Sequence, residues 1–114
     1  MYRNLSPEEF LKNPARFHVI DVRSQEEWDS FHEAGAIHVP LIGLEERAGE
    51  LPKDRPLVLV CRTGGRSARA AQMLGRLGFD ARNLMGGLRM LAAARAQNGQ
   101  IGREEALEIM RRLG

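Results

Sequence analysis

The chain has 114 residues, a length that suits one domain with one hydrophobic core. Its formal net charge of +2 and its interleaved acidic and basic residues argue against a nucleic-acid-binding protein. No apolar run approaches the ~18 residues that a membrane-spanning helix needs, and residues 1–10 lack the apolar core of a signal peptide. Because a single cysteine also forms no intramolecular disulfide, we expect a cytoplasmic protein without membrane contacts.

The first half of the chain alternates between helical and strand patterns. The sequence Ser6-Pro7-Glu8-Glu9 places an N-cap residue, a first-turn proline and an acidic residue where a helix begins. Ser24 is a second N-cap residue, and acidic residues follow it in the first turn of its helix. The predicted elements are a helix over residues 7–12, a strand over 17–22, a helix over 25–32, a strand over 36–39 and a helix over 41–51.

The second half continues the alternation with short connections. Residues 57–60, LVLV, form a continuous apolar run, which is typical of a strand covered on both faces in a parallel sheet. The predicted elements are a strand over 57–60, a helix over 67–77, a strand over 81–84, and helices over 88–96 and 104–113. Alternating strands and helices indicate an α/β domain with a mainly parallel sheet.

The single cysteine, Cys61, directly follows the strand predicted over residues 57–60. Ligands bind beyond the carboxyl ends of the strands in such sheets, so a site is expected there. Two glycines and two arginines follow Cys61, and then a helix begins. Glycines allow backbone N–H groups to point inward as an anion-binding nest, and the helix N-terminus and the arginines add positive charge. We therefore predict that the thiolate of Cys61 is favoured and that the loop binds a small anion.

The loop CRTGGRS resembles the active-site loop of the rhodanese family, the thiosulfate sulfurtransferases. Other segments are similar to family motifs in the same order along the chain, and the resemblance covers about residues 3–95. These segments are Asp21-Val22-Arg23 with Glu27, His32 with Gly35-Ala36-Ile37-His38-Val39-Pro40, Gly78-Phe79, and Asn83-Leu84-Met85-Gly86-Gly87.

The resemblance implies one rhodanese-like domain with about five strands and helices on both faces of the sheet. It implies that Cys61 takes the outer sulfur of thiosulfate, becomes a persulfide and releases sulfite, and that cyanide or a thiol then removes the sulfur. The N–H groups of residues 62–67 would surround the persulfide, while Arg62 and Arg66 would attract the donor. The expected substrate-binding residues are Arg62, Thr63, Gly64, Gly65, Arg66 and Ser67. The implied partners are a small anionic sulfur donor and a thiol acceptor, for example a thioredoxin-like protein.

Asp21, Arg23 and Glu27 are expected to support the site rather than to react. Arg23 can pair with Glu27, four residues on, and brace the neighbouring loop. The three histidines are widely spaced without a metal-ligand pattern, and we expect His32 to have a structural role. The glycine pairs lack the spacing of nucleotide-binding motifs, so we expect neither a metal nor a cofactor.

The chain departs from the family pattern in three places. Phe31 replaces a common glycine, Glu33-Ala34 replaces Ile-Pro, and residues 88–97 lack the usual tryptophan. The first two changes put the local packing in question. We predict a rhodanese-like domain over residues 1–97 and a C-terminal helical extension over 98–114, packed on the same domain or in contact with a partner or a second copy.

Two other functions compete with sulfur transfer. Cysteine phosphatases also place a cysteine between a strand and a helix N-terminus, but their signature has five residues between cysteine and arginine, whereas Cys61 and Arg66 enclose four. The shorter loop fits a sulfur atom better than a tetrahedral phosphate. The other alternative is a non-catalytic or redox-regulatory binding module, since an exposed thiol of low pKa also oxidises easily. The complete Cys61 loop argues against a non-catalytic module.

Overall fold

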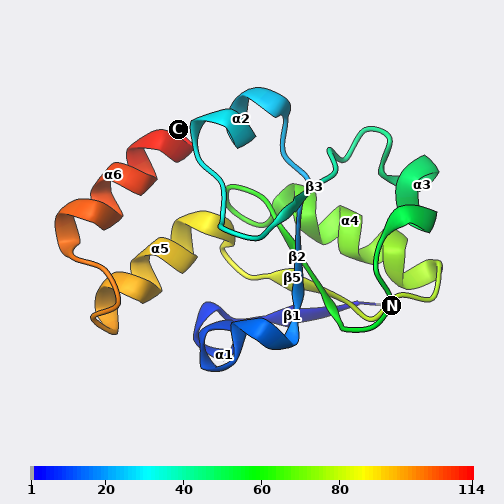
Figure 1. Cartoon of the computed structure of the whole chain (residues 1–114), viewed down its shortest axis with the longest axis horizontal. Helices are drawn as coiled ribbons and strands as arrows, with labels where there is room; N and C mark the ends of the chain where they lie inside the picture. Colours follow the sequence, from blue (N-terminus) through cyan, green and yellow to red (C-terminus); the bar gives the residue numbers. More distant parts are fainter. Residues whose placement is uncertain (1) are drawn as a thin grey trace.

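The computed structural model of the chain describes residues 2–114, and Figure 1 shows the order of its elements. The strands are β1 (Arg3–Leu5), β2 (His18–Asp21), β3 (Ile37–His38), β4 (Leu57–Val60) and β5 (Ala81–Leu84). The α-helices are α1 (Pro7–Lys12), α2 (Gln25–Ser30), α3 (Leu44–Arg47), α4 (Gly65–Arg76), α5 (Gly87–Gln97) and α6 (Arg103–Leu113), and the 3-10 helices are η1 (Pro14–Arg16) and η2 (Ala48–Glu50). No helix of the described residues has the length and apolar character to cross a membrane.

The five strands form one parallel sheet in the order β1-β5-β4-β2-β3, which confirms the predicted fold class. β4 lies at the centre and pairs with β5 on one side and β2 on the other. The sequence patterns did not reveal β1, because three residues, Arg-Asn-Leu, are too few to show the strand period. β1 is an edge strand that pairs with β5 and places Asn4 opposite Asn83.

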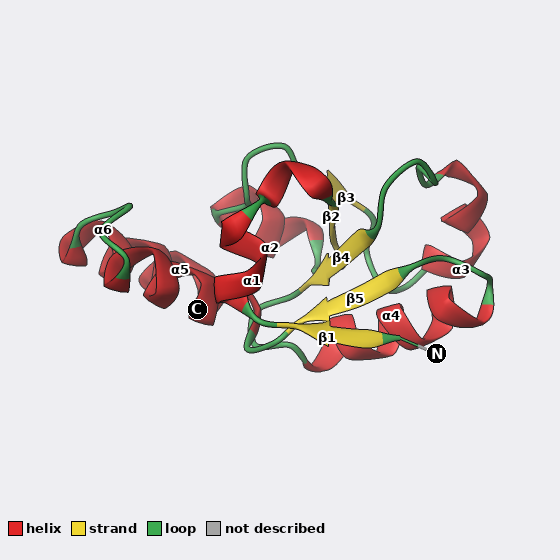
Figure 2. Ribbon diagram, turned by 90° about the horizontal axis from the view of Figure 1, so that it is seen from below, coloured by secondary structure: helices red, strands yellow, loops and turns green. Residues whose placement is uncertain are grey.

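Helices cover both faces of the sheet, and each face has its own hydrophobic core (Figures 1 and 2). Side chains alternate along β4, so that Leu57 and Leu59 join one core while Val58 and Val60 join the other. The first core includes side chains of α3 and α4, and the second includes side chains of α1 and α5. The unbroken apolar run of β4 therefore reflects burial on both faces.

The carboxyl ends of the strands all lie at the same end of the sheet, as the arrowheads in Figure 2 show. Hydrogen bonds connect the segments that follow the strands at this end. The N–H of Leu41, after β3, donates to the carbonyl of Val22, after β2, at 3.0 Å. The N–H of Leu88, after β5, donates to the carbonyl of Cys61, after β4, at 2.9 Å. The predicted site residues therefore lie in connected segments at the carboxyl end of the sheet.

α1 has its predicted bounds, whereas the other helices differ from theirs. α2 ends at Ser30, two residues early, and α5 and α6 each begin one residue early. The helix predicted over 41–51 begins only at Leu44, because the preceding turn holds Gly43 at a φ of +91°, and its last part is the 3-10 helix η2. α4 begins at Gly65, two residues earlier than predicted, because Gly64 adopts a left-handed conformation and acts as its N-cap.

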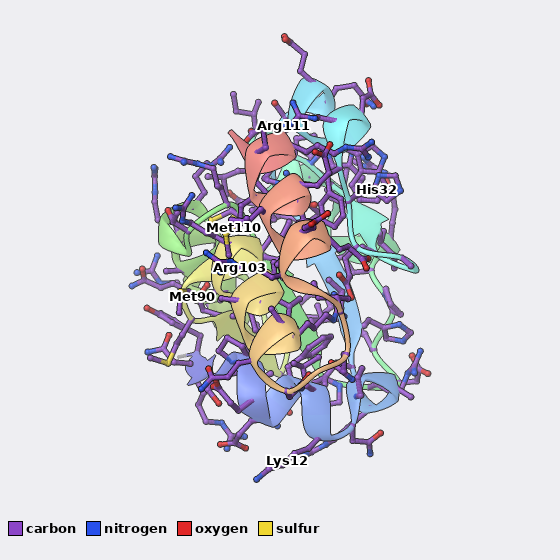
Figure 3. The ribbon with its side chains drawn as sticks, turned by 90° about the vertical axis from the view of Figure 1, so that its left-hand side faces the viewer. Lys12, His32, Met90, Arg103, Met110 and Arg111 are labelled. Carbon is purple, nitrogen blue, oxygen red and sulfur yellow. The ribbon has the colours of Figure 1, made fainter. Side chains whose placement is uncertain are left out.

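α6 packs on the outside of α5 and reaches α2 at its far end (Figures 1 and 3). Its buried residues are Ala106 and Leu113, and Leu113 joins the core shared by α1 and α5. The hydroxyl of Ser30, the last residue of α2, donates to the carbonyl of Arg112 at 2.9 Å. The helix over 104–113 matches the expected position, while the division of the chain at residue 97 stays a prediction.

Candidate active site

The loop after β4 turns sharply into α4 around Cys61. Gly64 has a φ of +105°, a conformation that other residues rarely adopt. A Cβ at this position would also lie 3.3 Å from the backbone nitrogen of Gly86, in the turn after β5. Because α4 begins at Gly65, its first N–H groups have no partner within the helix and lie in this loop.

The sulfur of Cys61 accepts hydrogen bonds from these N–H groups. The N–H of Gly64 lies 3.1 Å from Sγ and that of Ser67 lies 3.4 Å away, and the Ser67 hydroxyl is 3.3 Å from Sγ. Burial raises the pKa of the thiol, but the hydrogen bonds from Ser67, Gly64 and Thr63 outweigh it and lower the pKa below its ordinary value. The loop therefore has the geometry of the predicted nest.

Cys61 is 1% exposed, which corrects the expectation of an exposed thiol. Cys61 directly follows β4, the central strand of the sheet, which has β2 on one side and β5 on the other. Since Sγ remains in contact with N–H donors, the side chain is buried among polar groups as well as apolar ones.

Gly87, at the start of α5, fixes the backbone of the cysteine loop. It has a φ of +66°, and a Cβ there would lie 2.5 Å from the carbonyl oxygens of both Cys61 and Arg62. This close approach allows the N–H of Arg89 to donate to the carbonyl of Arg62 at 3.1 Å, beside the bond from Leu88 to Cys61. The turn after β5 therefore holds the loop through its carbonyl groups, which leaves the loop N–H groups free to face the sulfur.

Arg66 forms a two-pronged ion pair with Glu27 of α2, at 2.7 Å between Nη1 and Oε1 and 2.9 Å between Nη2 and Oε2. The hydrogen bonds from Arg66 lower the pKa of Glu27 to about 2, although partial burial opposes the shift. This contact overturns the expectation that Glu27 pairs with Arg23. Arg23 precedes Ser24, the N-cap of α2, and therefore lies outside the helical turn that would bring the two side chains together.

Arg23 instead pairs with Asp21 in the interior. Its Nη2 lies 2.8 Å from Oδ2 of Asp21, its Nε lies 3.0 Å from Oδ1, and both side chains are 0% exposed. Nη2 also donates to the carbonyl of Phe31 at 2.6 Å. The pair connects the end of β2 to the segment after α2. The supporting role of these two residues stays a prediction.

Parts of the loop also reach the surface and the C-terminal segment. Arg62 is half-buried and its Nη1 donates to the carbonyl of Gly114 at 3.0 Å, so the segment that ends α6 contacts the loop. Thr63 and Gly65 are exposed. Of the two arginines expected to attract a donor, Arg66 is paired with a carboxylate and Arg62 with a carbonyl.

His32 stacks on Trp28, with 3.8 Å between the ring centroids, and His38 stacks on the same ring at 4.7 Å. Nδ1 of His32 lies 2.9 Å from the carbonyl of Trp28, and Nε2 of His38 lies 2.7 Å from the carbonyl of Arg23. Because a carbonyl only accepts, each of these ring nitrogens carries a proton and donates. Each histidine therefore has a stacking partner and a carbonyl acceptor.

Glu33, which stands at one of the departures from the family pattern, is buried against Arg95 of α5. Nη1 of Arg95 donates to Oε1 of Glu33 at 2.8 Å, and the second prong joins Nη2 to Oε2. The hydrogen bonds to Glu33 raise the pKa of Arg95. Phe31, at the other departure, packs against the core that includes α1 and α5. Glu33 therefore has a partner on α5, and Phe31 packs on the face of the sheet that α1 and α5 cover.

Asn83 is the site residue that the sequence analysis did not single out. It lies in β5, is 6% exposed, and accepts a hydrogen bond from the Ser67 hydroxyl at 2.6 Å. The available signal was an asparagine inside a strand buried on both faces, where a polar side chain needs a hydrogen-bond partner.

The sequence and the fold both match known proteins. The model of the rhodanese-like domain family matches residues 6–94. The chain is 38% identical over 88 residues to the uncharacterized protein YqhL of Bacillus subtilis (strain 168), covering 76% of this chain and 70% of that protein. It is 36% identical over 77 residues to the thiosulfate sulfurtransferase PspE of Escherichia coli (strain K12), covering 66% of this chain and 74% of that protein.

Longer proteins contain similar segments. The probable adenylyltransferase/sulfurtransferase MoeZ of Mycobacterium tuberculosis (strain ATCC 25618 / H37Rv) is 42% identical over 83 residues, covering 70% of this chain but only 21% of that protein. Among solved structures, a rhodanese-related protein of Thermoplasma volcanium superposes with a TM-score of 0.78 at 28% identity, covering 82% of this chain and 93% of that chain. The chain therefore belongs to the rhodanese-like domain family, in which several of its relatives are named sulfurtransferases.

Proposed function

We propose that this protein is a sulfurtransferase in which Cys61 carries sulfane sulfur as a persulfide, from thiosulfate or another persulfide donor to a thiol or cyanide. The observation that carries the proposal is the pair of N–H groups, from Gly64 and Ser67, that point at Sγ of Cys61. They favour a sulfur anion, which is the nucleophile that the transfer requires. The relative named thiosulfate sulfurtransferase supports this choice of donor.

In the first half of the reaction, the Cys61 thiolate attacks the outer sulfur of thiosulfate. A bond forms between Sγ and that sulfur, the sulfur–sulfur bond of thiosulfate breaks, and its electron pair leaves with sulfite. The enzyme keeps a persulfide whose negative charge lies on the outer sulfur. The N–H groups at the start of α4 stabilise that charge, because the helix N-terminus attracts anions.

Arg66 contributes positive charge where sulfite departs. Its ion pair with Glu27 holds the guanidinium in one orientation, while 39% of the side chain remains exposed for an anion to contact. A pre-oriented cation stabilises charge that develops in the transition state without having to reorganise. In this assignment Glu27 positions Arg66, and Asp21 and Arg23 hold the adjoining backbone.

In the second half of the reaction, an acceptor nucleophile attacks the outer sulfur. The bond between that sulfur and Sγ breaks, and Cys61 leaves as the thiolate, ready for the next cycle. One cysteine is sufficient for this scheme. The acceptor is proposed to be a small thiol, cyanide or the thiol of a thioredoxin-like protein.

Intact-mass measurement after incubation with thiosulfate tests the proposal. We expect the wild-type chain to gain the mass of one sulfur atom and to lose it on addition of a thiol or cyanide, with sulfite released in equal amount. Cys61→Ser should gain nothing while keeping the same unfolding midpoint. Transfer by Cys61→Ser at the wild-type rate contradicts the assignment of Cys61.

The competing functions give different readouts in the same samples. Turnover of a phosphate ester without any sulfur gain favours a cysteine phosphatase. Reversible oxidation of Cys61 by peroxide, without sulfur transfer from any member of a donor panel, favours a redox-regulatory module. A panel of thiosulfate and small persulfides, each combined with cyanide, glutathione or thioredoxin, identifies the donor and acceptor classes.

A further inference from the structure

A chain of side-chain hydrogen bonds leads from the sulfur of Cys61 to the edge strand β1. Sγ lies 3.3 Å from Oγ of Ser67, and this oxygen lies 2.6 Å from Oδ1 of Asn83. On the other side of the Asn83 amide, Nδ2 lies 3.3 Å from Oδ1 of Asn4. Ser67 and Asn83 are buried, whereas Asn4 is exposed on the edge strand β1. Three residues thus connect the nucleophile to the surface.

The direction of this chain is fixed by counting hydrogens. Oδ1 of Asn83 only accepts, so the single hydroxyl hydrogen of Ser67 points toward Asn83. Oγ of Ser67 then has only lone pairs to offer to Cys61, and the S–H group must donate to it. The observed arrangement is therefore the one that suits the thiol form of Cys61.

The thiolate requires the reverse direction. An ionised Sγ only accepts, so the Ser67 hydroxyl must turn toward it. Oγ would then face Oδ1 of Asn83 with no hydrogen between two oxygens that are 2.6 Å apart, which is repulsive. The conflict disappears if the Asn83 amide rotates by half a turn, because Nδ2 then donates to Ser67.

This rotation fits the surroundings of Asn83. The amide oxygen and nitrogen have nearly the same size, so their exchange leaves the packing of the buried side chain unchanged. After the exchange, Oδ1 of Asn83 faces Asn4, which must present its own amide nitrogen. Asn4 is exposed, so it can rotate freely to do so. Every member of the chain thus keeps a partner in both directions.

We propose that Asn83 is a positioning residue of the active site: by turning its amide it reverses the Cys61–Ser67–Asn83–Asn4 hydrogen-bond chain and lets Ser67 donate to the thiolate. On ionisation the S–H bond breaks, its electron pair stays on sulfur, and the proton passes to solvent water. The relevance for turnover rests on the proposed sulfur transfer, whereas the effect on ionisation does not. Asn83 acts through Ser67 and does not touch the reacting atoms.

The elements next to the loop also carry charged side chains. α4 provides Arg66 and α2 provides its partner Glu27, whose pKa of about 2 keeps the carboxylate ionised at neutral pH. Asp21, the last residue of β2, forms a buried ion pair with Arg23. Arg62 in the loop, Arg69 on α4 and Arg89 on α5 are further cations of these elements. The hydrogen-bond chain is therefore the neutral part of the site that responds to the proton of Cys61.

The rate of Cys61 alkylation by iodoacetamide, measured against pH with the full chain, tests the proposal. Ser67→Ala should raise the midpoint of the profile and slow alkylation at neutral pH about tenfold, the effect of one lost hydrogen bond to a charged group. Asn83→Leu should shift the midpoint in the same direction with a loss of roughly two- to fivefold, because Ser67 loses the donor that polarises it. Asn83→Leu should have no further effect in the Ser67→Ala background.

Independent, additive effects of the two substitutions overturn the proposal, and so does an unchanged profile in Asn83→Leu. Asn98→Leu, at an exposed asparagine after α5, is the control and should leave the profile unchanged. Sulfur transfer is measured separately, so a chain that alkylates as predicted but transfers no sulfur refutes the proposed function alone.

A spectroscopic measurement keeps the test valid if Asn83→Leu does not fold. In the ¹⁵N-labelled wild-type chain, the side-chain amide signals of Asn83 should shift with the same midpoint as Cys61 alkylation. In Ser67→Ala, which lacks the link, the shift should vanish. An equal shift in Ser67→Ala shows only the electric field of the thiolate and contradicts the rotation.

Discussion

Two neighbouring strand ends bury polar side chains in opposite ways. At the end of β2, Asp21 forms an ion pair with Arg23 in which both side chains are 0% exposed and each charge faces its counter-charge. After β4, the sulfur of Cys61 is instead held by the neutral N–H groups of Gly64 and Ser67. Dipoles stabilise an anion without neutralising it, so the sulfur keeps its reactivity. The ion pair of Asp21 and Arg23 thus holds the backbone, whereas the N–H groups around Cys61 prepare a nucleophile.

The largest effect on stability is expected from opening the ion pair. Asp21→Asn leaves the Arg23 guanidinium buried without a counter-charge and should lower the free energy of unfolding by about 3–5 kcal/mol. Urea denaturation measures this loss. The matched control is Glu50→Gln, which opens the exposed pair with Arg47 and should cost less than about 1 kcal/mol. Equal losses in the two variants would remove the distinction between a structural ion pair and an ordinary surface one.

The next effect tests the backbone that holds the cysteine loop. Gly87→Ala places a Cβ 2.5 Å from two carbonyl oxygens in a left-handed conformation, and should lower the free energy of unfolding by about 2–4 kcal/mol. It should also slow persulfide formation, because the loop must shift. Gly99→Ala has a similar φ of +83° but no atom within 4 Å, so only the backbone strain of about 1 kcal/mol is expected. Urea denaturation and intact-mass kinetics measure both properties.

A smaller effect is expected from freeing Arg66. Glu27→Gln removes the carboxylate from the pair and should lower the free energy of unfolding by about 1–2 kcal/mol, since the pair is partly exposed. The pKa of Glu27 is lowered from 4.5 to about 2, so its stabilisation is complete above pH 4.5 and is lost as the pH falls through about 2. Urea denaturation across this pH window should show that loss in the wild type and a smaller loss in Glu27→Gln.

The smallest effect is expected at His32. His32→Gln removes a stacked ring on the surface of α2 and should change the free energy of unfolding by less than about 1 kcal/mol. Sulfur transfer should stay within about twofold of the wild-type rate, with the same pH dependence, because the histidine bonds only to the carbonyl of Trp28. A changed pH profile of transfer would instead place His32 among the groups that exchange protons during turnover.

The sequence patterns were informative where a local rule decides the structure. The bounds of β4 and β5 match their predictions because each strand is a short run between clear turn signals. Ser24 is also the N-cap of α2, as predicted, with the N–H of Glu27 donating to the serine hydroxyl. The cysteine loop could be predicted in the same way, because a strand end, two glycines and a helix start all lie within a few residues.

Contacts between distant segments could not be predicted from these patterns. The pairing of Glu27 with Arg66 depends on how α2 lies against α4, whereas spacing along the chain suggested Arg23. Asn83 reaches Ser67 because β5 lies beside β4, and nothing local to β5 indicates that neighbour. β1 has too few residues to show a periodic signal in the sequence. It forms a strand because its backbone pairs with β5.

The pairing of β1 with β5 has a consequence for how the molecule assembles. Asn4 and Asn83 are 79 positions apart, yet they are opposite each other in the sheet. During synthesis, the first strand must wait until most of the chain has left the ribosome before its partner exists, and contacts of such long range close slowly. The outermost link to the nucleophile is therefore among the last to form, so a nascent chain acquires its complete reactive centre only when folding is nearly finished.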